Sequence, residues 1–328
     1  MATYKGISGF NIKSLSSDPS NLVEGEIWYN STSGTLKVAP LVESWASGGN
    51  IPSARGGSAF AGTQTAGALF GGRTSVPTTT DETKEYNGTS WTAGGTMTTA
   101  RLNLGGCGTQ TAALASGGSS TGSPATNTDA CEEYNGASWT AGGTISSRRY
   151  LKGCGTQTAG LITGGYTTTA VNVTEEYNGA SWTAGGANTF TKYGIANSGT
   201  QTAALGFSGS PAHTATNSYN GTSWTAVPAT INTERADMAA AGIQTAALAF
   251  GGFTPPGAET GATESYDGST WTTSPGSLGT ARTALTGGGT STVALAAGGG
   301  TSASGGITPG IATEEFSIAT TAQTVTTS

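Results

Sequence analysis

The amino-acid sequence predicts an all-β fold, a six-bladed β-propeller closed by an N-terminal outer strand. The prediction rests on a repeated segment, on evenly spaced tryptophans and on the lack of any helical periodicity. The segment EEYNGASWTAGG occurs at residues 132–143 and 175–186, with looser copies at 84–95, 217–228 and 264–275. The tryptophans recur every 42 to 48 residues, at Trp45, Trp91, Trp139, Trp182, Trp224 and Trp271. A period in this range is typical of four-stranded propeller blades.

Length and composition narrow the class of protein. The chain has 328 residues, of which only 10% are charged and 54 are glycine, but a hydrophobic content of 35% argues against disorder. The net charge of −6 lacks the basic footprint that nucleic acid requires. There is no apolar run long enough to insert into a membrane. The first residues, MATYKGISGF, lack the apolar region of a secretory signal, so we expect synthesis in a cytoplasm.

The three cysteines are expected to be small buried thiols. Cys107 and Cys154 occupy the same position of the repeat, and Cys131 precedes a Tyr-Asn-Gly turn. No spacing resembles a zinc site, and an odd count argues against a disulfide framework. We therefore expect no metal and no cofactor.

The sequence of each repeat predicts four strands and two tight turns. Asn-Gly within EEYNGASW is the strongest two-residue hairpin signal, because both turn positions favour a positive φ. Glycine and alanine dominate the first two strands, which suits crowding near a central axis. The tryptophan on the fourth strand is large enough to cover the gap between neighbouring blades. About ten residues after each tryptophan comes a base, at Arg55, Arg101, Arg149, Lys192, Arg235 and Arg282.

Over about residues 41–318 this pattern resembles the kelch-type β-propeller. Three features carry the resemblance: the Gly-Gly after the second strand, the tyrosine of the third and the tryptophan of the fourth. The glycine pairs begin at Gly71, Gly117, Gly164, Gly251 and Gly298, and the tyrosines are Tyr86, Tyr134, Tyr177, Tyr219 and Tyr266. One repeat departs, with Ser-Gly-Ser in place of Gly-Gly and Ser218 in place of glutamate.

The two ends of the repeat region predict how the ring closes. The chain enters with a lone fourth-strand segment, VESWASGG at 42–49, and leaves with three strands that have no tryptophan. We expect the N-terminal strand to complete the last blade, which leaves no exposed edge. The predicted domains are an attachment segment with a β-hairpin at 1–40 and a six-bladed propeller at 41–328.

The segment GEIWYNSTSGTLKV at 25–38 predicts that hairpin. It resembles a short segment, G-x-I-W-Y-N…L-K-V, of bacteriophage tail-fibre and other virion appendage proteins. The resemblance implies an attachment or oligomerisation element, with other virion proteins as partners and a homotrimer as one assembly. The attachment residues would be Ile27, Trp28, Tyr29, Leu36 and Val38. The alternative is an extra hairpin packed on the propeller rim, since an isolated hairpin needs a partner surface either way.

One end of the repeats is expected to carry the function. The turns between first and second strands, and between third and fourth, are nearly identical in every copy, whereas the loops at the other end vary. Variation on one face of a repeat scaffold usually marks the binding face. The candidate ligand-binding residues there are Arg148, Tyr150, Tyr166, Phe190, Tyr193, His213, Glu234, Asp237 and Phe253.

We do not expect an enzyme. The single histidine, His213, cannot supply the copper site of galactose-oxidase-like propellers. The segment SYDGSTW at 265–271 resembles a sialidase Asp-box, which is structural there, and the repeated bases are interpreted as partners of third-strand glutamates or backbone carbonyls. Glu234 and Asp237 are a close acidic pair that could support glycoside hydrolysis, but their loop spacing predicts no geometry.

The expected function is therefore that of a phage virion structural protein. Neutral Thr, Ser and Asn loops with scattered aromatic residues suit host-surface glycans, so a tail-fibre or appendage adhesin is the specific hypothesis. It would be made in the host cytoplasm and be extracellular on the particle. Two alternatives stay open, a non-adhesive capsid decoration protein and a carbohydrate-active enzyme, because fold alone does not choose among functions.

Overall fold

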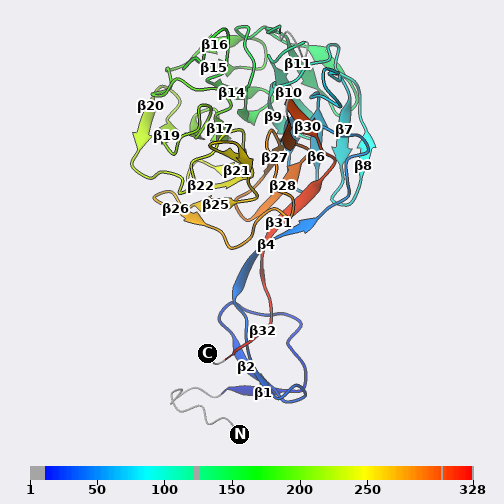
Figure 1. Ribbon diagram of the computed structural model, residues 1–328, viewed down its shortest axis with the longest axis vertical. Coiled ribbons are helices and arrows are strands. Elements are labelled where there is room, and N and C mark those ends of the chain that lie inside the picture. Colours follow the sequence, from blue (N-terminus) through cyan, green and yellow to red (C-terminus); the bar gives the residue numbers. More distant parts are fainter. Residues whose placement is uncertain (1–11, 121–125, 304–305, 327–328) are drawn as a thin grey trace. The chain divides into compact units, whose positions relative to one another are not determined.

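The computed structural model describes residues 12–120, 126–303 and 306–326. These residues form an all-β protein without helices (Figure 1). The chain divides into two compact units, a smaller one of Met1–Ser44 with Ile318–Ser328 and a larger one of Trp45–Ser317. Most strands belong to four-stranded sheets, and those of the larger unit have a propeller-like arrangement.

Six of the four-stranded sheets contain the repeats, and we number them I to VI in chain order. The first strands are β5 (Ala59–Gly62), β9 (Gly105–Thr109), β13 (Gly153–Thr156), β17 (Ala196–Thr200), β21 (Ala239–Ile243) and β27 (Thr286–Gly289). The second strands are β6 (Gly67–Phe70), β10 (Ala112–Ser116), β14 (Ala159–Thr163), β18 (Ala203–Phe207), β22 (Ala246–Phe250) and β28 (Val293–Ala297).

The third and fourth strands complete each sheet. The third strands are β7 (Thr83–Tyr86), β11 (Cys131–Tyr134), β15 (Thr174–Tyr177), β19 (Thr216–Tyr219), β25 (Thr263–Tyr266) and β31 (Thr313–Thr320). The fourth are β8 (Trp91–Ala93), β12 (Trp139–Ala141), β16 (Trp182–Ala184), β20 (Trp224–Val227), β26 (Trp271–Thr273) and, for sheet VI, the N-terminal β4 (Leu41–Ser47). Two small hairpins, β23 (Phe253–Thr254) with β24 (Ala258–Glu259) and β29 (Gly300–Ala303) with β30 (Gly306–Pro309), lie in variable loops.

The first strands pack against one another around a common centre. Each contacts the first strand of the next sheet, in the order β5, β9, β13, β17, β21, β27 and back to β5. Their small residues permit this approach: a Cβ atom on Gly106 would lie 2.7 Å from the Cβ of Ala59 in the neighbouring sheet. The glycine and alanine content of these strands is therefore a packing requirement.

Tryptophans of the fourth strands cover the junctions between sheets, as predicted. Trp139 Nε1 of sheet II donates a hydrogen bond of 2.9 Å to Thr83 Oγ1 of sheet I. Equivalent bonds join Trp45 to Thr263, Trp91 to Thr313, Trp224 to Thr174 and Trp271 to Thr216. At the junction of sheets II and III, Cys131 occupies the threonine position opposite Trp182.

Two further inter-sheet links were not predicted from the sequence. In the first, the GTQT glutamine reaches the preceding sheet: Gln110 Nε2 donates to the carbonyl oxygens of Gly67 and Tyr86. In the second, the tyrosine of the third strand binds the preceding sheet: Tyr134 OH donates a hydrogen bond of 2.6 Å to Glu85 Oε1. Gln64, Gln157, Gln201 and Gln244 repeat the first link, and Tyr86, Tyr177 and Tyr219 the second.

These links are missing at particular junctions among the described residues. At the junction of sheets IV and V, Ser218 replaces the glutamate that would accept from Tyr266. At the junction of sheets V and VI, Ser265 and Phe316 replace the acceptor and donor, and Ser291 replaces the glutamine. The Trp45 bond is the one link of the three that this junction keeps.

Replacing Tyr134 with phenylalanine is expected to lower the free energy of unfolding by about 1.5 kcal/mol, because the buried ring loses a hydrogen bond to a carboxylate. Tyr266→Phe is the matched control, since no described residue is a hydrogen-bond partner of its hydroxyl, and should change stability by less than about 0.5 kcal/mol. Urea denaturation of both variants measures the difference. Equal losses would show that the tyrosine–glutamate link contributes nothing.

The hydrogen bond between tyrosine and glutamate also affects the pKa of the tyrosine hydroxyl. Burial, together with the hydrogen bond to Glu315, raises the pKa of Tyr86 to about 12. Burial and the bond to Glu176 have the same effect on Tyr219. Because the folded protein holds these protons more tightly than the unfolded chain does, the stability they contribute is present below pH 10 and is lost between about pH 10 and 12.

The Asn-Gly turns differ from the two-residue turns that the sequence predicted. Tyr86 pairs with Trp91, so the loop has four residues, and of these only Gly88 has a positive φ, at 89°. Asn87 instead accepts hydrogen bonds from the backbone N–H groups of Thr89 and Ser90 through its side-chain oxygen. Asparagine is therefore used here for its side chain rather than for its tolerance of a left-handed backbone.

The smaller unit is a four-stranded sheet in the order β1 (Lys13–Leu15), β2 (Ile27–Asn30), β3 (Thr35–Val38) and β32 (Gln323–Thr324). The predicted hairpin is present as β2 and β3. Residues 318–328 were expected to belong to the repeats, but β32 pairs with β3 of the small sheet. The physical reason is that β3 offers an unpaired edge to the last residues of the chain, which follow the end of the repeat.

Candidate functional site

The variable loops of each repeat are joined at one end of the sheet. In every repeat an isolated antiparallel bridge connects the loop that leads into the first strand with the loop that follows the second. The bridges pair Gly56 with Arg73, Leu102 with Ser119, Arg149 with Tyr166, Tyr193 with Ser210, Ala236 with Phe253 and Thr283 with Gly300. This confirms that the two variable loop types share one end.

Six residues with a left-handed backbone surround a cavity at this end. They occupy one equivalent position in each repeat: Gly57, Asn103, Tyr150, Gly194, Asp237 and Ala284, with φ between 50° and 65°. Backbone hydrogen bonds join neighbours in this set, from Gly57 N to Ala284 O at 3.0 Å, from Asn103 N to Gly57 O at 2.7 Å and from Gly194 N to Tyr150 O at 2.8 Å. We call these residues the left-handed ring.

The cavity inside the left-handed ring has a volume of about 250 Å³. All six ring residues line it, together with Lys152, Tyr193, Ser210, Arg73 and Phe253. Its wall therefore combines aromatic rings with polar groups of both charges, a composition typical of small-molecule sites.

Three tyrosines at the rim form an aromatic cluster. The ring centroids of Tyr150 and Tyr193 are 5.0 Å apart, and Tyr166 is 5.3 Å from Tyr193 at 79° and 6.3 Å from Tyr150. The guanidinium of Arg149 lies 4.7 Å from the centre of the Tyr166 ring. Its Nη1 also donates to Asn127 Oδ1 at 2.6 Å, which fixes the arginine over the aromatic face.

The structure corrects the role of Arg148. Arg148 is buried and pairs with Glu175, while the next residue, Arg149, lies over the tyrosines. The roles predicted for these two residues are reversed, because the spacing from the tryptophan to the base varies from 9 to 11 residues among the repeats. Arg148 is therefore a structural base and not a ligand-binding candidate.

The other predicted ligand-binding residues do not form one site. Phe190 and His213 form a pair of their own, with ring centroids 4.6 Å apart. Burial and the nearby charge of Lys192 lower the pKa of His213 to about 4, and its Nδ1 accepts a hydrogen bond from the Ala215 N–H. Glu234 is exposed, whereas Asp237 lines the cavity, so these two carboxylates do not line a common site.

The repeated bases are structural, as interpreted from the sequence. Buried arginines pair with carboxylates of the third strand or the loop before it: Arg55 with Glu82, Arg101 with Glu132, Arg148 with Glu175, Arg235 with Glu264 and Arg282 with Glu314. Sheet IV replaces both partners at once, with Lys192 for the arginine and Asn217 for the glutamate. There the lysine donates to the carbonyl oxygen of Pro211 instead.

Of the three charged residues that line the cavity, Arg73, Lys152 and Asp237, only Asp237 was predicted. Asp237 was a candidate, and Lys152 was missed because it immediately precedes the small residues of strand β13. Lys152 Nζ donates to Leu285 O at 3.0 Å. Burial lowers the pKa of Lys152 and raises that of Asp237, while the attraction between the two charges opposes both shifts. Charged groups desolvated in a cavity are candidates for function.

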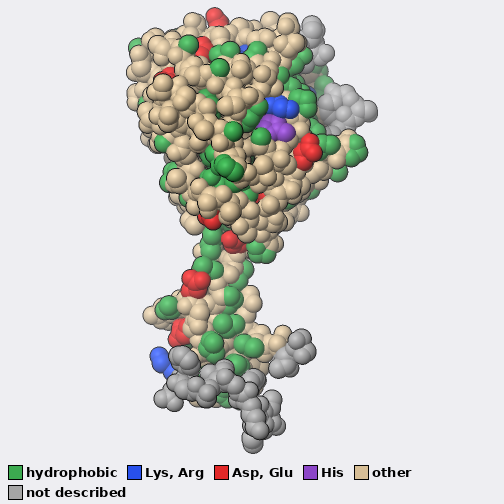
Figure 2. Space-filling model, turned by 90° about the vertical axis from the view of Figure 1, so that its left-hand side faces the viewer, with side chains coloured by type: hydrophobic (Ala, Val, Ile, Leu, Met, Phe, Trp, Pro, Cys, Tyr) green, Lys and Arg blue, Asp and Glu red, His purple; other side chains and the backbone are tan. Residues whose placement is uncertain are grey.

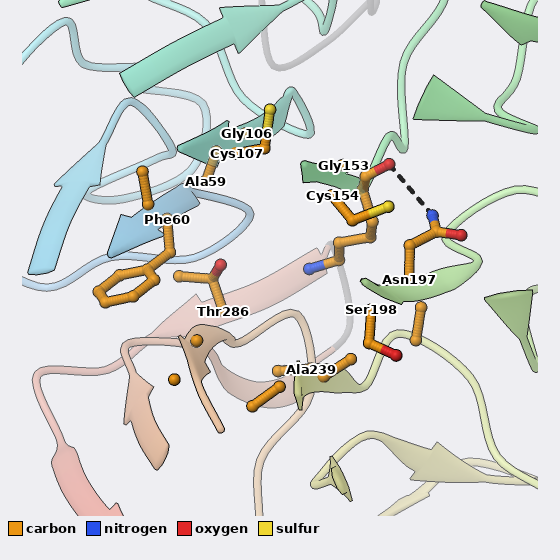
Figure 3. A pocket seen from close by; sticks show the side chains of 18 of the residues that line it. Ala59, Phe60, Gly106, Cys107, Gly153, Cys154, Asn197, Ser198, Ala239 and Thr286 are labelled. Carbon is orange, nitrogen blue, oxygen red and sulfur yellow. Dashed lines mark hydrogen bonds between the residues drawn. The ribbon is translucent and has the colours of Figure 1, made fainter. Parts of the chain in front are cut away.

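A second, narrower cavity of about 140 Å³ lies between the first strands of all six sheets (Figure 3). Lys152 also lines this cavity, and Asn197 Nδ2 donates a hydrogen bond of 3.2 Å to the carbonyl oxygen of Lys152. Cys107 and Cys154 line this cavity, and all three cysteines are free and buried, as predicted. Burial raises the pKa of the Cys154 thiol to about 12, so it stays protonated at neutral pH. Within the described residues no three His, Cys, Asp or Glu side chains gather as metal ligands.

The predicted attachment residues separate onto the two faces of the small sheet. Strand pairing sets Ile27 opposite Val38 and Tyr29 opposite Leu36, so these four share one face. Trp28 lies on the other face, fully buried, and its Nε1 donates to Asp18 Oδ1 at 3.0 Å. Trp28 is therefore a core residue of the unit, which corrects its assignment as a contact residue. Ile27 and Tyr29 remain 43% and 39% exposed.

The surface view in Figure 2 is dominated by uncharged polar groups and backbone, with scattered hydrophobic and few charged side chains. No helix long and apolar enough to span a membrane occurs in the described part of the chain. A scan against protein-family models and a search of curated proteins returned no match.

Proposed function

We propose that this chain is a structural protein of a bacteriophage virion, an adhesive tail-fibre or appendage protein that binds host-surface glycans at the variable-loop end of a closed six-bladed, kelch-type propeller. The observation that carries the binding function is the aromatic cluster of Tyr150, Tyr166 and Tyr193 with Arg149 beside an open cavity. No catalytic step is part of this proposal.

Closure of the ring is supported by the contacts between its ends. The first strand of sheet I contacts that of sheet VI, and Gly57 N donates to Ala284 O across the same junction. Gln64 and Tyr86 of sheet I also bind sheet VI, at the Ala294 carbonyl and the Glu315 carboxylate. Strand β4 supplies the outer strand of sheet VI, so a single chain can complete six blades.

Glycan binding is supported by the chemistry of the loops. Sugars present one apolar face of C–H groups and a periphery of hydroxyls, and tyrosine offers both an apolar ring and a hydroxyl. The loops around the cluster are rich in Thr, Ser and Asn, which donate and accept hydrogen bonds without charge. The net charge of −6 favours polyhydroxylated ligands over nucleic acid.

The virion assignment rests on the resemblance of residues 25–38 to phage appendage segments, and the small sheet supports it. Ile27 and Tyr29 of one face are exposed, as are Leu41 and Val325 of the same unit, whereas Leu36 on that face is buried and is not an attachment candidate. Exposed apolar residues gathered on one small unit suit contact with another protein. The proposed partners are other virion proteins or further copies of this chain as a homotrimer.

Alanine in place of Tyr166 is expected to reduce binding of the full-length chain on a glycan array at least tenfold, because a stacking surface worth about 1–1.5 kcal/mol or more is removed. Thr111→Ala, in an exposed hairpin at the other end of the sheets, is the matched control and should bind as the parent does. Absence of any glycan binding by the parent would favour a non-adhesive decoration protein. Turnover of labelled polysaccharide would favour an enzyme.

Serine at both Ile27 and Tyr29 is expected to abolish self-association or incorporation into particles while leaving the melting temperature nearly unchanged, since both side chains are exposed. Val76→Ser removes a similarly exposed apolar side chain from the larger unit and serves as control. Light scattering and particle assembly measure the two effects. Parent-like assembly by the double variant would remove the small sheet from the attachment proposal.

A further inference from the structure

We infer that the cavity inside the left-handed ring is a subsite for a single sugar ring that carries a carboxylate, such as a uronic or sialic acid. The inference rests on the proposed glycan function and specifies the ligand class. Lys152 would bind the carboxylate, Asp237 and Asn103 the hydroxyls, and the rings of Tyr150 and Tyr193 the apolar face.

Comparison of the six repeats shows that Lys152 and Asp237, two of the three charged residues that line this cavity, depart from their equivalents; Arg73 is the third. The position of Lys152 is otherwise small, being Ala59, Gly105, Ala196, Ala239 and Thr286 in the other five repeats. Asp237 is likewise the one charged residue of the left-handed ring. The scaffold forms without a charge at either position in the remaining sheets, so the two charges are not required for folding a repeat, and both line the same cavity.

The hydrogen bonds of Lys152 are incomplete. An ammonium group has three donors, and the Leu285 carbonyl accepts one of them. No carboxylate among the described residues lies within 4.0 Å of its Nζ, although five arginines of the same unit are paired in this way. A half-buried cation with free donors favours an anionic acceptor. The carboxylate of a ligand would supply it.

Asp237 and Asn103 lack hydrogen-bond donors, whereas Lys152 lacks acceptors. Neither side chain has a hydrogen-bond partner among the residues that the structure describes, and both line the cavity from the left-handed ring. A carboxylate accepts up to four hydrogen bonds, and an amide both donates and accepts. Sugar hydroxyls satisfy both groups at once. Because Asp237 would repel a simple anion, a ligand with hydroxyls as well as a carboxylate fits the cavity better than an inorganic ion does.

Size and shape agree with one ring. A cavity of about 250 Å³ is smaller than the roughly 300–1,000 Å³ typical of sites for drug-sized molecules. Tyr150 and Tyr193, whose ring centroids are 5.0 Å apart, provide a wall against which one pyranose can pack. Tyr166 belongs to the rim cluster but does not line this cavity, so it would contact a neighbouring sugar of a longer glycan.

NMR titration of the full-length protein tests the inference, with methyl glucuronide and methyl sialoside against methyl glucoside and methyl galactoside as probes. We expect at least one acidic glycoside to bind tenfold or more tightly than both neutral ones. Lys152→Ala, which introduces the residue found at this position in sheets I, IV and V, should abolish that preference. Lys152→Met keeps the length of the side chain and should do the same if the alanine variant fails to fold. Thr111→Ala, in the exposed hairpin at the other end of the sheets, should leave monosaccharide affinity within twofold of the parent.

The outcomes separate this inference from the proposed function. Equal binding of acidic and neutral glycosides, or an acid preference that survives in both Lys152 variants, overturns the subsite. Binding on the glycan array without monosaccharide binding in the titration also overturns the subsite and leaves the adhesive function standing. Binding in neither assay overturns both.

Discussion

Replacing Glu132 with alanine is expected to lower the free energy of unfolding by about 3–5 kcal/mol, because it leaves a buried guanidinium without its counter-charge. Arg101 and Glu132 are both buried, with Arg101 Nη2 and Glu132 Oε1 2.8 Å apart. Burial lowers the pKa of Arg101 even though Glu132 raises it, so the pair only partly offsets desolvation. Glu132 also accepts a hydrogen bond from the Thr98 N–H, which the variant leaves unpaired.

Glu82→Ala provides the matched control for this prediction. Its carboxylate pairs with Arg55 but is 43% exposed, so water can solvate the arginine once the carboxylate is gone. The loss there is expected to be less than half of that at Glu132. Urea denaturation at constant pH gives both values. Similar losses at the two sites would mean that burial of the pair does not determine its contribution.

Replacing Trp139 with alanine is expected to cost about 3–5 kcal/mol, the range for large aromatic residues removed from a core. The side chain is buried, its ring centroid lies 4.9 Å from that of Phe70 in sheet I, and its Nε1 binds Thr83. Removal therefore opens a cavity at a junction and breaks a bond between two sheets.

Trp182→Ala tests whether the junction bond contributes in addition to burial. Trp182 is half-buried and faces Cys131 instead of threonine, so its loss should be smaller by about 1 kcal/mol. Thermal and urea denaturation of both variants measure the difference. A larger loss at Trp182 than at Trp139 would contradict the account of the tryptophans as links between sheets.

The repeated signals predicted most of the fold, because each one corresponds to a local physical requirement. Tryptophan, Gly-Gly and the base recur in the same order along the repeats, and each occupies an equivalent place in the sheets. The glutamine and tyrosine links escaped prediction although their residues recur just as regularly. Gln110 and Tyr134 bind atoms of the preceding repeat, and that spatial relation has no sequence spacing of its own.

The candidate site was predicted in part for a related reason. Loop variation correctly brought Tyr150, Tyr166 and Tyr193 together, because all three lie in loops joined by the bridges at one end. Lys152 was missed because it lies directly before strand β13, outside the variable loops in which ligand-binding residues are expected. Comparison of its position with Ala59 and Ala196 in the other copies would have revealed it. Trp28 was misassigned because hydrophobicity alone does not say which face of a two-sided sheet a residue occupies.

The fourth strand of sheet VI has a mechanical consequence. Both covalent connections to the smaller unit leave from sheet VI, through β4 and its neighbour β31. A tensile load applied to the smaller unit would therefore enter the repeats at this one sheet. Sheet VI holds sheet I by the glutamine, tyrosine and tryptophan links, but it holds sheet V by the Trp45 bond alone among those three. Rupture under force is thus expected to begin between sheets V and VI, so a chain held through its small unit would yield there first.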